Sequence, residues 1–436
     1  MDSTAPTDPV PDPIGIQPDS RSSPFPLPYD LVSLISLSIL SFPPIPRTHS
    51  LLSLSLVSHE FLQIAQPLLY TSPYISFDPP DTTPPGTTYS RLLSLVRTLE
   101  RRRDLAERVR GLEGLGGWGK RCLSEGIPER RKISKIMIRL CGLCQRVEKV
   151  DVPFIVEADK QELLTVFRRW KGLREVRYGT GYEVRDPWIV NVDQRVMDEW
   201  GSAKWYIEDF GELSNHEWRG VKRFELNQRL RVRDEEGEKL GFKLEEFSLN
   251  LTKNSKLSFA YLSHYLSSSI STLTSLSLRE HQLSSPSTLF QVVRTYGQTL
   301  KILETTSSNQ FDSNLDLVHC ISASCPSLLH LSLGSRVDHL LPTLSLLSFL
   351  PSLQTLDLKS VHSLEIEKER LEDIIFGFPN LRVLECEPIH ANVEDGLKQE
   401  REVAKEFRKL EGKVRGRRKV RSKVRFWKWR VEIQDV

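Results

Sequence analysis

The sequence predicts an α/β protein in which a small helical module is followed by a long array of alternating strands and helices. Two observations support this fold class. An apolar run interrupted by serines, residues 25–42, has the spacing of a short amphipathic helix. Further along, one strand-like template, apolar-x-x-apolar-x-apolar, recurs between residues 147 and 386, with amphipathic segments between its copies. Strand, turn, helix and turn repeated in this way build an α/β solenoid.

The region before the helical module predicts no fixed structure and no membrane segment. Residues 1–24 are polar, acidic and rich in proline, a composition typical of a disordered tail. The run at 25–42 contains four serines and stops at Pro43, so it falls short of the roughly 20 apolar residues that a bilayer requires. Six cysteines in 436 residues do not form a disulfide framework, and no secretion signal is evident. We therefore expect a cytoplasmic or nuclear protein.

The helical module is expected at 25–77. Leu31, Ile35 and Ile39 recur at a spacing of four, which places them on one face of a helix. The segment "PPIPR" then breaks the helix, and a second pattern follows at the same kind of spacing, formed by Leu54, Val57, Phe61, Ile64, Ala65 and Leu68. We expect two or three short helices around one apolar seam, with a core so small that a partner surface would complete it.

These residues resemble an F-box, the fungal F-box-like proteins in particular. The Leu-Pro start, the Val-Ser-x-x-Phe element and the exit segment "QIAQPLLYTSPYISF" occur in the family's order, with Asp30 and Ser36 as departures. The resemblance implies a surface that binds a Skp-family adaptor and, through it, a cullin. The positions that match are Leu27, Pro28, Leu31, Val32, Ile35, Val57 and Phe61. The alternative is a helical cap on the following domain.

After a Pro/Thr linker at 78–90, the template copies begin at Val147, Leu173, Val221, Leu244, Leu273, Leu300, Leu328, Leu353 and Leu381. Their spacings are 26, 48, 23, 29, 27, 28, 25 and 28 residues, which is the leucine-rich-repeat range apart from one gap. That gap contains a segment, 180–217, that is either an insertion or a degenerate repeat.

The intervals between strands carry helix patterns. One stripe is expected at Leu289, Val292, Val293 and Tyr296, and another at Leu371, Ile374, Ile375 and Phe378, which Gly377 would end. Three residues before a template, a recurring position that we expect to point inward holds Cys144, Trp170, Trp218, Ile270, Cys325, Leu350 and Phe378. Residues 91–395 thus resemble an irregular leucine-rich-repeat domain, with parallel strands on its concave face, helices on its convex face, and Val109 and Leu112 in a first, atypical repeat.

Alternate residues of each strand would point outward on the concave face and could hold a protein target. Their mixed signs favour a protein over a polyanion. These positions are Glu175, Arg177, Arg223, Glu225, Glu246, Ser248, Ser277, Arg279, His330, Ser332, Asp357, Lys359, Glu385 and Glu387.

No set of residues predicts catalysis or a cofactor. "GLGGWGKR" at 114–121 resembles a phosphate-binding loop, but Arg121 stands where a magnesium-binding hydroxyl is required, so we interpret it as a glycine-rich turn. Cys141 and Cys144 form a lone Cys-x-x-Cys without the further ligands that zinc needs, and we expect them in the core.

The charged C-terminal extension, 396–436, contains a basic arm. Between Arg408 and Arg430 there are twelve Lys or Arg and one acid, whereas the rest of the chain is mildly acidic. Around "KVRSKVRF" the basic residues alternate with Val and Ser, as in a strand, and two tryptophans follow. This arm could cap the repeat array, act as a nuclear-import signal, or bind RNA or single-stranded DNA. Its central cations are Arg417, Arg418, Lys419, Arg421, Lys423 and Arg425.

Taken together, the resemblances imply a non-catalytic substrate-recognition adaptor of a Skp-cullin-F-box ubiquitin ligase. Such a subunit acts by position, because it raises the effective concentration of a target lysine near a thioester on another protein. The alternatives are an F-box-like repeat scaffold outside a ligase, or an RNA-associated repeat protein that acts through the basic arm.

Overall fold

The computed structural model divides the chain into two compact units between Leu69 and Tyr70. The predicted end of the helical module at residue 77 lies beyond this division, because Ile75 is buried in the core of unit 2 and Tyr74 forms a parallel bridge with Glu113. The structure describes residues 29–75, 87–115, 127–153, 155–178, 213, 218–226, 241–250, 256–257, 259–283, 287–307, 314–334, 340–361, 370–388, 405, 408–415, 418–425 and 428–435.

Unit 1 consists of three helices. They are α1 (Tyr29–Ile39), α2 (Pro44–Ser55) and α3 (His59–Thr71), whose last residues belong to unit 2. The core of unit 1 is small, with Ile39, Leu51 and Ala65 as its centre. Leu54 and Leu68 pack partly against it, as the seam predicted.

The predicted break between the first two helices is confirmed, because α1 ends at Ile39 and α2 begins at Pro44, but the part of "PPIPR" after Pro43 forms the first turn of α2. Pro43 is the N-cap and Pro44 is the first helical residue. The amides of a first helical turn have no acceptor within the helix, so proline costs little there. The sequence pattern of the prolines therefore marks the start of a helix.

Unit 2 is built on one long, mostly parallel sheet that runs from β1 to β11 in chain order and ends with an antiparallel hairpin. The parallel strands are β1 (Gly111–Leu112), β2 (Lys149–Asp151), β3 (Glu175–Tyr178), β4 (Arg223–Leu226), β5 (Glu246–Asn250), β6 (Lys256–Leu257), β7 (Ser275–Leu283), β8 (Ile302–Ser307), β9 (His330–Leu333), β10 (Thr355–Val361) and β11 (Val383–Pro388). Strand β6 pairs with β7 off the main path, and all the other strands up to β11 are neighbours in sequence order.

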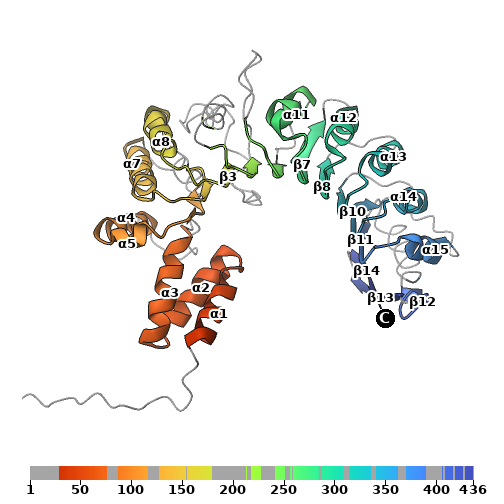
Figure 1. Cartoon of the computed structure of the whole chain (residues 1–436), viewed down its shortest axis with the longest axis horizontal. Coiled ribbons are helices and arrows are strands. Elements are labelled where there is room, and N and C mark those ends of the chain that lie inside the picture. Colours follow the sequence, from red (N-terminus) through yellow and green to blue (C-terminus); the bar gives the residue numbers. More distant parts are fainter. Residues whose placement is uncertain are drawn as a thin grey trace, which may run out of the picture. The chain divides into compact units, whose positions relative to one another are not determined.

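Helices connect these strands and lie along one side of the sheet (Figure 1). They are α4 (Thr87–Arg101), α5 (Arg103–Ala106), α7 (Ile127–Leu143), η2 (Glu157–Asp159), α8 (Lys160–Phe167), α11 (Phe259–Leu266), η3 (Ser267–Ser269), α12 (Ser287–Tyr296), α13 (Asn314–Ser324), α14 (Leu340–Leu347) and α15 (Arg370–Gly377). The fold class of unit 2 is therefore α/β with a parallel sheet, as predicted.

Each copy of the template carries a strand, which begins at its third residue. The apolar positions of neighbouring copies are in register, for example Val176 with Phe224 and Leu331 with Leu356. Because these residues share the core with residues of the helices, the alternate polar positions lie on the opposite face of the sheet. We call that side the polar face. The predicted stripe on α12 is also confirmed, since all four of its residues are buried.

The inward position before each template is confirmed for Trp170, Trp218 and Cys325 but is wrong for Ile270, which is 50% exposed. The 3-10 turn η3 shifts the chain by one residue and places Ser269 inward instead. The hydroxyl of Ser269 donates to the Phe242 carbonyl at 2.9 Å and accepts from the Leu244 amide at 2.9 Å. The buried Ser269 hydroxyl thus has both a donor and an acceptor partner in the backbone of the preceding connection.

Hydrogen bonds of this kind link successive connections along unit 2. The indole of Trp170 donates to the Cys144 carbonyl at 2.6 Å, and that of Trp218 donates to the Phe167 carbonyl at 3.1 Å. Thr272 and Thr299 likewise donate to carbonyls of the preceding connection, at 2.8 and 2.6 Å. Because the partners are mostly 26 to 29 residues apart, these bonds fix several connections to the one before.

The C-terminal arm continues the sheet. Strand β14 (Lys428–Asp435) pairs antiparallel with β11, β13 (Arg418–Arg425) pairs with β14, and the short β12 (Val414–Arg415) pairs with β13. Val420, Val431 and Ile433 are buried in the core. The period-two prediction for this segment is therefore confirmed. The predicted insertion at 180–217 lies outside the described residues, apart from Leu213.

Candidate interaction surfaces

Helix α1 buries one side of its surface in unit 1. Val32, Ser36 and Ile39 are buried, and their spacing of four and three places them on one face. The buried hydroxyl of Ser36 donates to the Val32 carbonyl at 2.8 Å, which satisfies it inside the helix. Val32 is therefore a core residue, and its predicted place in an adaptor-binding surface is wrong.

The other faces of α1 leave apolar side chains exposed. Leu31, Leu34 and Ile35 are 42%, 63% and 37% exposed, so Leu31 and Ile35 do not share the core position of Ile39, with which the sequence pattern groups them. Both follow the helical period, but Val32 and Ile39 supply the buried side. Leu31 and Ile35 thus remain available to a partner.

Residues near the junction of α2 and α3 behave in the same way. Val57 lies in the turn between the two helices and is 65% exposed, so it is not part of the seam. Phe61 is half-buried in α3, and its amide hydrogen bonds to the Ser58 hydroxyl at 3.3 Å. Leu27 and Pro28 lie outside the described residues.

Unit 1 holds most of the large apolar side chains that are exposed in the described part of the chain. The exceptions are Ile270, Ile302 and Phe349 in unit 2. Large exposed apolar patches are typical of protein–protein or membrane interaction sites. We call the exposed group of unit 1 the apolar set; it consists of Leu31, Leu34, Ile35, Leu37, Phe42, Ile45, Leu52, Leu56, Val57 and Leu62.

The polar face of strands β2 to β5 carries a ladder of ion pairs. Arg177 contacts Glu175 at 2.7 Å and Glu225 at 3.3 Å. Lys149 contacts Glu175 at 3.3 Å, and Arg223 contacts Glu246 at 2.7 Å. Ser248 lies half-buried beside this ladder. The charges predicted for target binding in this half are thus paired with one another across the strands.

The polar face of β7 to β11 has a different pattern. Glu304 accepts hydrogen bonds from Arg279 at 2.7 Å and Ser277 at 3.0 Å, and its carboxylate lies 3.7 Å from His330. Burial alone would raise the pKa of Glu304, but Arg279 and Ser277 outweigh it and lower the pKa below its ordinary value. Glu304 was missed by the sequence prediction, although it occupies the same template position as Ser277.

The polar face continues over strands β9 to β11. Ser332 is buried and donates to the Asp357 carboxylate at 3.2 Å, and Glu385 pairs with Arg430 of β14 at 2.8 Å. Asp357 and Glu385 are registered opposite each other on neighbouring strands. The side chains of Lys359 and Glu387 lie outside the described residues.

The start of the glycine-rich segment is occupied by a carboxylate of the protein itself. Gly114 has a left-handed backbone, with φ of 85°, and its amide donates to Asp151 at 2.5 Å. A phosphate would have to displace this carboxylate next to Glu113. The interpretation of the segment as a turn therefore gains support, while residues 116–121 lie outside the described part.

Asp151 gives the polar face a pH-dependent contribution to stability. Burial raises the pKa of this carboxyl group from 3.8 to about 6, although the Gly114 amide and Arg177 act in the opposite direction. Between these two values the folded state holds a proton that the unfolded state has lost. The contribution of Asp151 is therefore most favourable below about pH 4 and is lost as the pH rises through about 6, by about 3 kcal/mol.

We expect Asp151→Asn to remove this dependence, because an amide does not ionise. The unfolding free energy of the variant, relative to the unaltered chain, should rise as the pH is raised from about 4 to about 7. Urea unfolding at several pH values measures the difference. A difference that stays constant with pH would contradict the assignment.

The two cysteines of the Cys-x-x-Cys segment lie in the hydrophobic core, as expected. Cys141 and Cys144 are buried, and burial raises the pKa of both thiols, that of Cys144 to about 12. Within the described residues, no three His, Cys, Asp or Glu side chains are placed to hold a metal ion.

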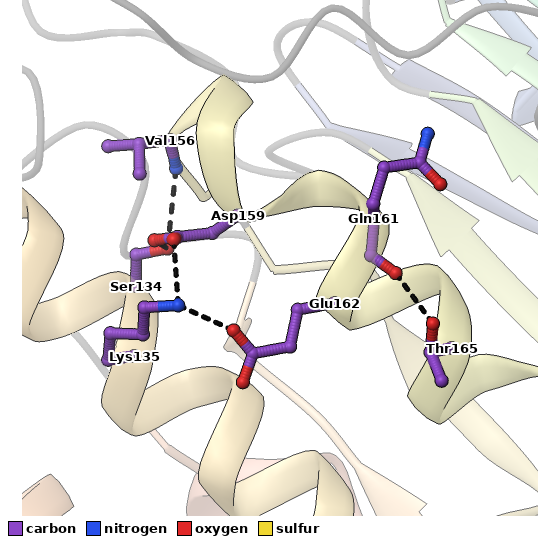
Figure 2. Close-up of polar contacts among 7 residues, drawn as sticks. All are labelled: Ser134, Lys135, Val156, Asp159, Gln161, Glu162 and Thr165. Atoms are coloured by element: carbon purple, nitrogen blue, oxygen red, sulfur yellow. Dashed lines mark hydrogen bonds and ion pairs between the residues drawn. The ribbon is translucent and has the colours of Figure 1, made fainter.

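A polar network joins α7 to the start of α8 on the helical side of unit 2 (Figure 2). The buried Ser134 donates to Asp159 at 2.6 Å, and Lys135 contacts Asp159 at 2.9 Å and Glu162 at 2.5 Å. The Val156 amide donates weakly to Ser134, at 3.4 Å. Every one of these groups bonds to a neighbouring helix or turn, so we interpret the network as structural.

Several cations of the basic arm bind the last repeat. Lys413 contacts Glu372 at 2.6 Å, and Arg415 contacts Asp373 at 2.8 Å, both acids lying in the first turn of α15. The half-buried Arg418 donates to the carbonyls of Phe378 and Leu381. These contacts favour the capping role among the alternatives for the arm.

For the other predicted cations of the arm, the structure describes the side chains of two and leaves out those of the rest. Lys419 and Arg421 are exposed on β13. Arg417 and Trp427, as well as the side chains of Lys423, Arg425 and Trp429, lie outside the described residues.

None of the helices in the described part is long and apolar enough to cross a bilayer. No family model matches the chain, and no curated protein matches it. Among the solved structures that match is a crystal structure of a protein from Bacteroides fragilis, determined as a structural genomics target. It is 9% identical, covers 68% of this chain and 82% of its own length, and aligns with a TM-score of 0.35, which is too low to carry an argument about fold or function.

Proposed function

We propose that this chain is a substrate-recognition adaptor of a Skp-cullin-F-box ubiquitin ligase, acting in the cytoplasm or the nucleus. The apolar set of unit 1 is the observation that carries the proposal. A three-helix unit with a core of this size exposes Leu34, Leu56 and Val57 at 63%, 86% and 65%, and a partner surface would remove them from water. Burial of apolar area is the main favourable term in protein association.

The resemblance to an F-box gives the partner its identity. Leu31, Ile35 and Val57 match the family's motif and are all exposed, which is what contact with a Skp-family adaptor requires. Phe61 is half-buried and would contribute from the edge of the surface. Val32 matches the motif as well, but its role is to hold α1 against the core.

In this proposal unit 2 is a leucine-rich-repeat solenoid that holds the target on its polar, concave face. The strand interval, the in-register apolar positions and the hydrogen bonds from each connection to the one before support a repeat architecture. The proposed adaptor performs no chemistry. It would position a target lysine near a thioester carried by another protein.

The experiment is a pull-down of the full chain with a purified Skp-family adaptor. We expect Leu31→Asp/Ile35→Asp to weaken binding by at least about thirtyfold, because two charges would be placed in an apolar contact. Ile270→Asp/Phe349→Asp is the matched control, since these side chains are exposed in unit 2. It should bind like the unaltered chain.

The opposite result would favour the other class of function. Equal binding by both double variants, or no binding by the unaltered chain, would contradict the role in a ubiquitin ligase. The chain would then be an F-box-like repeat scaffold outside a ligase. The basic arm would then be tested for RNA by point substitutions. Its deletion is unsuitable, because β14 pairs with β11 and contributes Val431 to the core.

A further inference from the structure

The C-terminal hairpin has two chemically distinct faces. On one face, Val420 of β13 and Val431 and Ile433 of β14 are buried in the core. Successive residues of a strand alternate between faces, so the residues between these lie on the opposite face. Lys419, Arg421 and Arg430 belong to that face and are exposed.

Most register positions on this outer side hold cationic residues. Its cross-strand pairs are Lys419 with Gln434, Arg421 with Glu432, Lys423 with Arg430, and Arg425 with Lys428. Six of these eight register positions hold Lys or Arg and one holds an acid. We call these six residues the cationic ribbon.

The cationic ribbon lies on the same side of the sheet as the polar face. Asp357 of β10 is registered with Glu385 of β11, Glu385 with Arg430 of β14, and Arg430 with Lys423 of β13. One row of positions therefore crosses from the acidic strands of the repeats onto the hairpin. Arg430 marks the boundary, because it pairs with Glu385 and Glu432, both at 2.8 Å.

We propose that the target-binding face extends over the hairpin, where the cationic ribbon binds an acidic segment of the target protein. This inference rests on the proposed function, since it names the chemistry of the target that the polar face would hold. It also gives the basic arm two roles on its two faces. The inner face closes the core, and the outer face recognises carboxylates.

The neighbouring charges select a peptide over a nucleic acid. A long polyanion that extended from the hairpin onto the neighbouring strands would meet Glu385 and Asp357. On the hairpin itself, Glu432 lies opposite Arg421, one of the ribbon residues. Like charges in such positions repel. A short acidic segment of a target can contact the hairpin alone. Basic residues next to that segment in the target would then lie near the acids of β10 and β11.

The test uses the full chain and a fluorescent peptide of about eight residues in which Glu and Ser alternate, a length that matches one strand. A peptide with Gln in place of Glu and a short single-stranded RNA are the comparisons. Fluorescence anisotropy gives the affinities. We expect the Glu peptide to bind, and its affinity to fall as salt is raised from about 0.05 to about 0.5 M.

Arg421→Gln/Lys423→Gln should weaken binding of the Glu peptide about fivefold. The matched control is Lys413→Gln/Arg415→Gln, which removes the same charge from cations that pair with α15 on the helical side. The control should bind like the unaltered chain. Both variants should unfold at the same urea concentration as the unaltered chain.

Three results would overturn the inference: equal weakening by both pairs, equal binding of the Gln peptide, or tighter binding of the RNA than of the Glu peptide. A binding affinity that does not change with salt would do the same, without any variant. The proposed function is tested separately, because Arg421→Gln/Lys423→Gln should still capture the Skp-family adaptor. Conversely, Leu31→Asp/Ile35→Asp should still bind the peptide.

Discussion

Replacing Trp170 by Ala is expected to lower the unfolding free energy of unit 2 by about 4 kcal/mol. Trp170 is 1% exposed, packs against Phe167 with ring centroids 4.9 Å apart, and donates to the Cys144 carbonyl. The substitution removes the largest type of side chain from the core and also removes the bond between two successive connections. Urea unfolding followed by circular dichroism measures the change.

Trp170→Phe separates these two contributions. The phenyl ring keeps most of the apolar contact but cannot donate to the Cys144 carbonyl, so we expect a smaller loss, about 1–3 kcal/mol. A loss as large as that of the Ala variant would mean that the hydrogen bond, and not the volume, dominates. No loss in either variant would contradict the assignment of Trp170 as a core residue.

Gly297→Ala is expected to destabilise unit 2 by about 3 kcal/mol, although it adds a single methyl group. A Cβ atom at this position would lie 2.7 Å from the Ser324 carbonyl oxygen and 2.9 Å from the Cys325 sulfur. Ser324 and Cys325 belong to the next connection, so the added atom forces two connections apart, and it also clashes with the Val293 carbonyl oxygen of its own connection. The inward position before β8 therefore requires glycine.

Gly377→Ala is the control for this substitution. Gly377 ends α15, and a Cβ atom there would meet nothing within 4 Å. Because alanine favours the helix, we expect the control to be neutral or slightly stabilising. If both glycine variants were equally stable, close packing at Gly297 would not be the reason for its glycine.

The array of strands and helices could be predicted from the sequence because every copy of the strand template has the same apolar spacing. Leu276, Leu303 and Leu331 occupy equivalent positions, and an error in one copy is corrected by the others. Ile270 was assigned wrongly because the 3-10 turn before β7 changes the register by one residue, and an apolar residue at the expected position hides that change. Period alone does not distinguish Ile270 from Ser269.

The surfaces were harder to predict, because pairing between side chains depends on distances that a sequence does not contain. Arg177 and Glu225 were expected to face a target, whereas they contact each other at 3.3 Å. In unit 1, Val32 and Leu31 both fit a helical stripe, and only the packing of three helices decides which is buried. The alternation in the C-terminal arm predicted a strand, but not its pairing with β11, which depends on a distant partner.

The most direct test of the central claim is to mix the full chain with a purified Skp-family adaptor and the N-terminal part of a cullin, and to separate the mixture by size-exclusion chromatography. The proposal predicts that the three proteins elute together, and that Leu31→Asp/Ile35→Asp elutes apart from an intact adaptor–cullin complex. An unaltered chain that elutes alone beside that complex would contradict the proposal that this protein is a ligase adaptor.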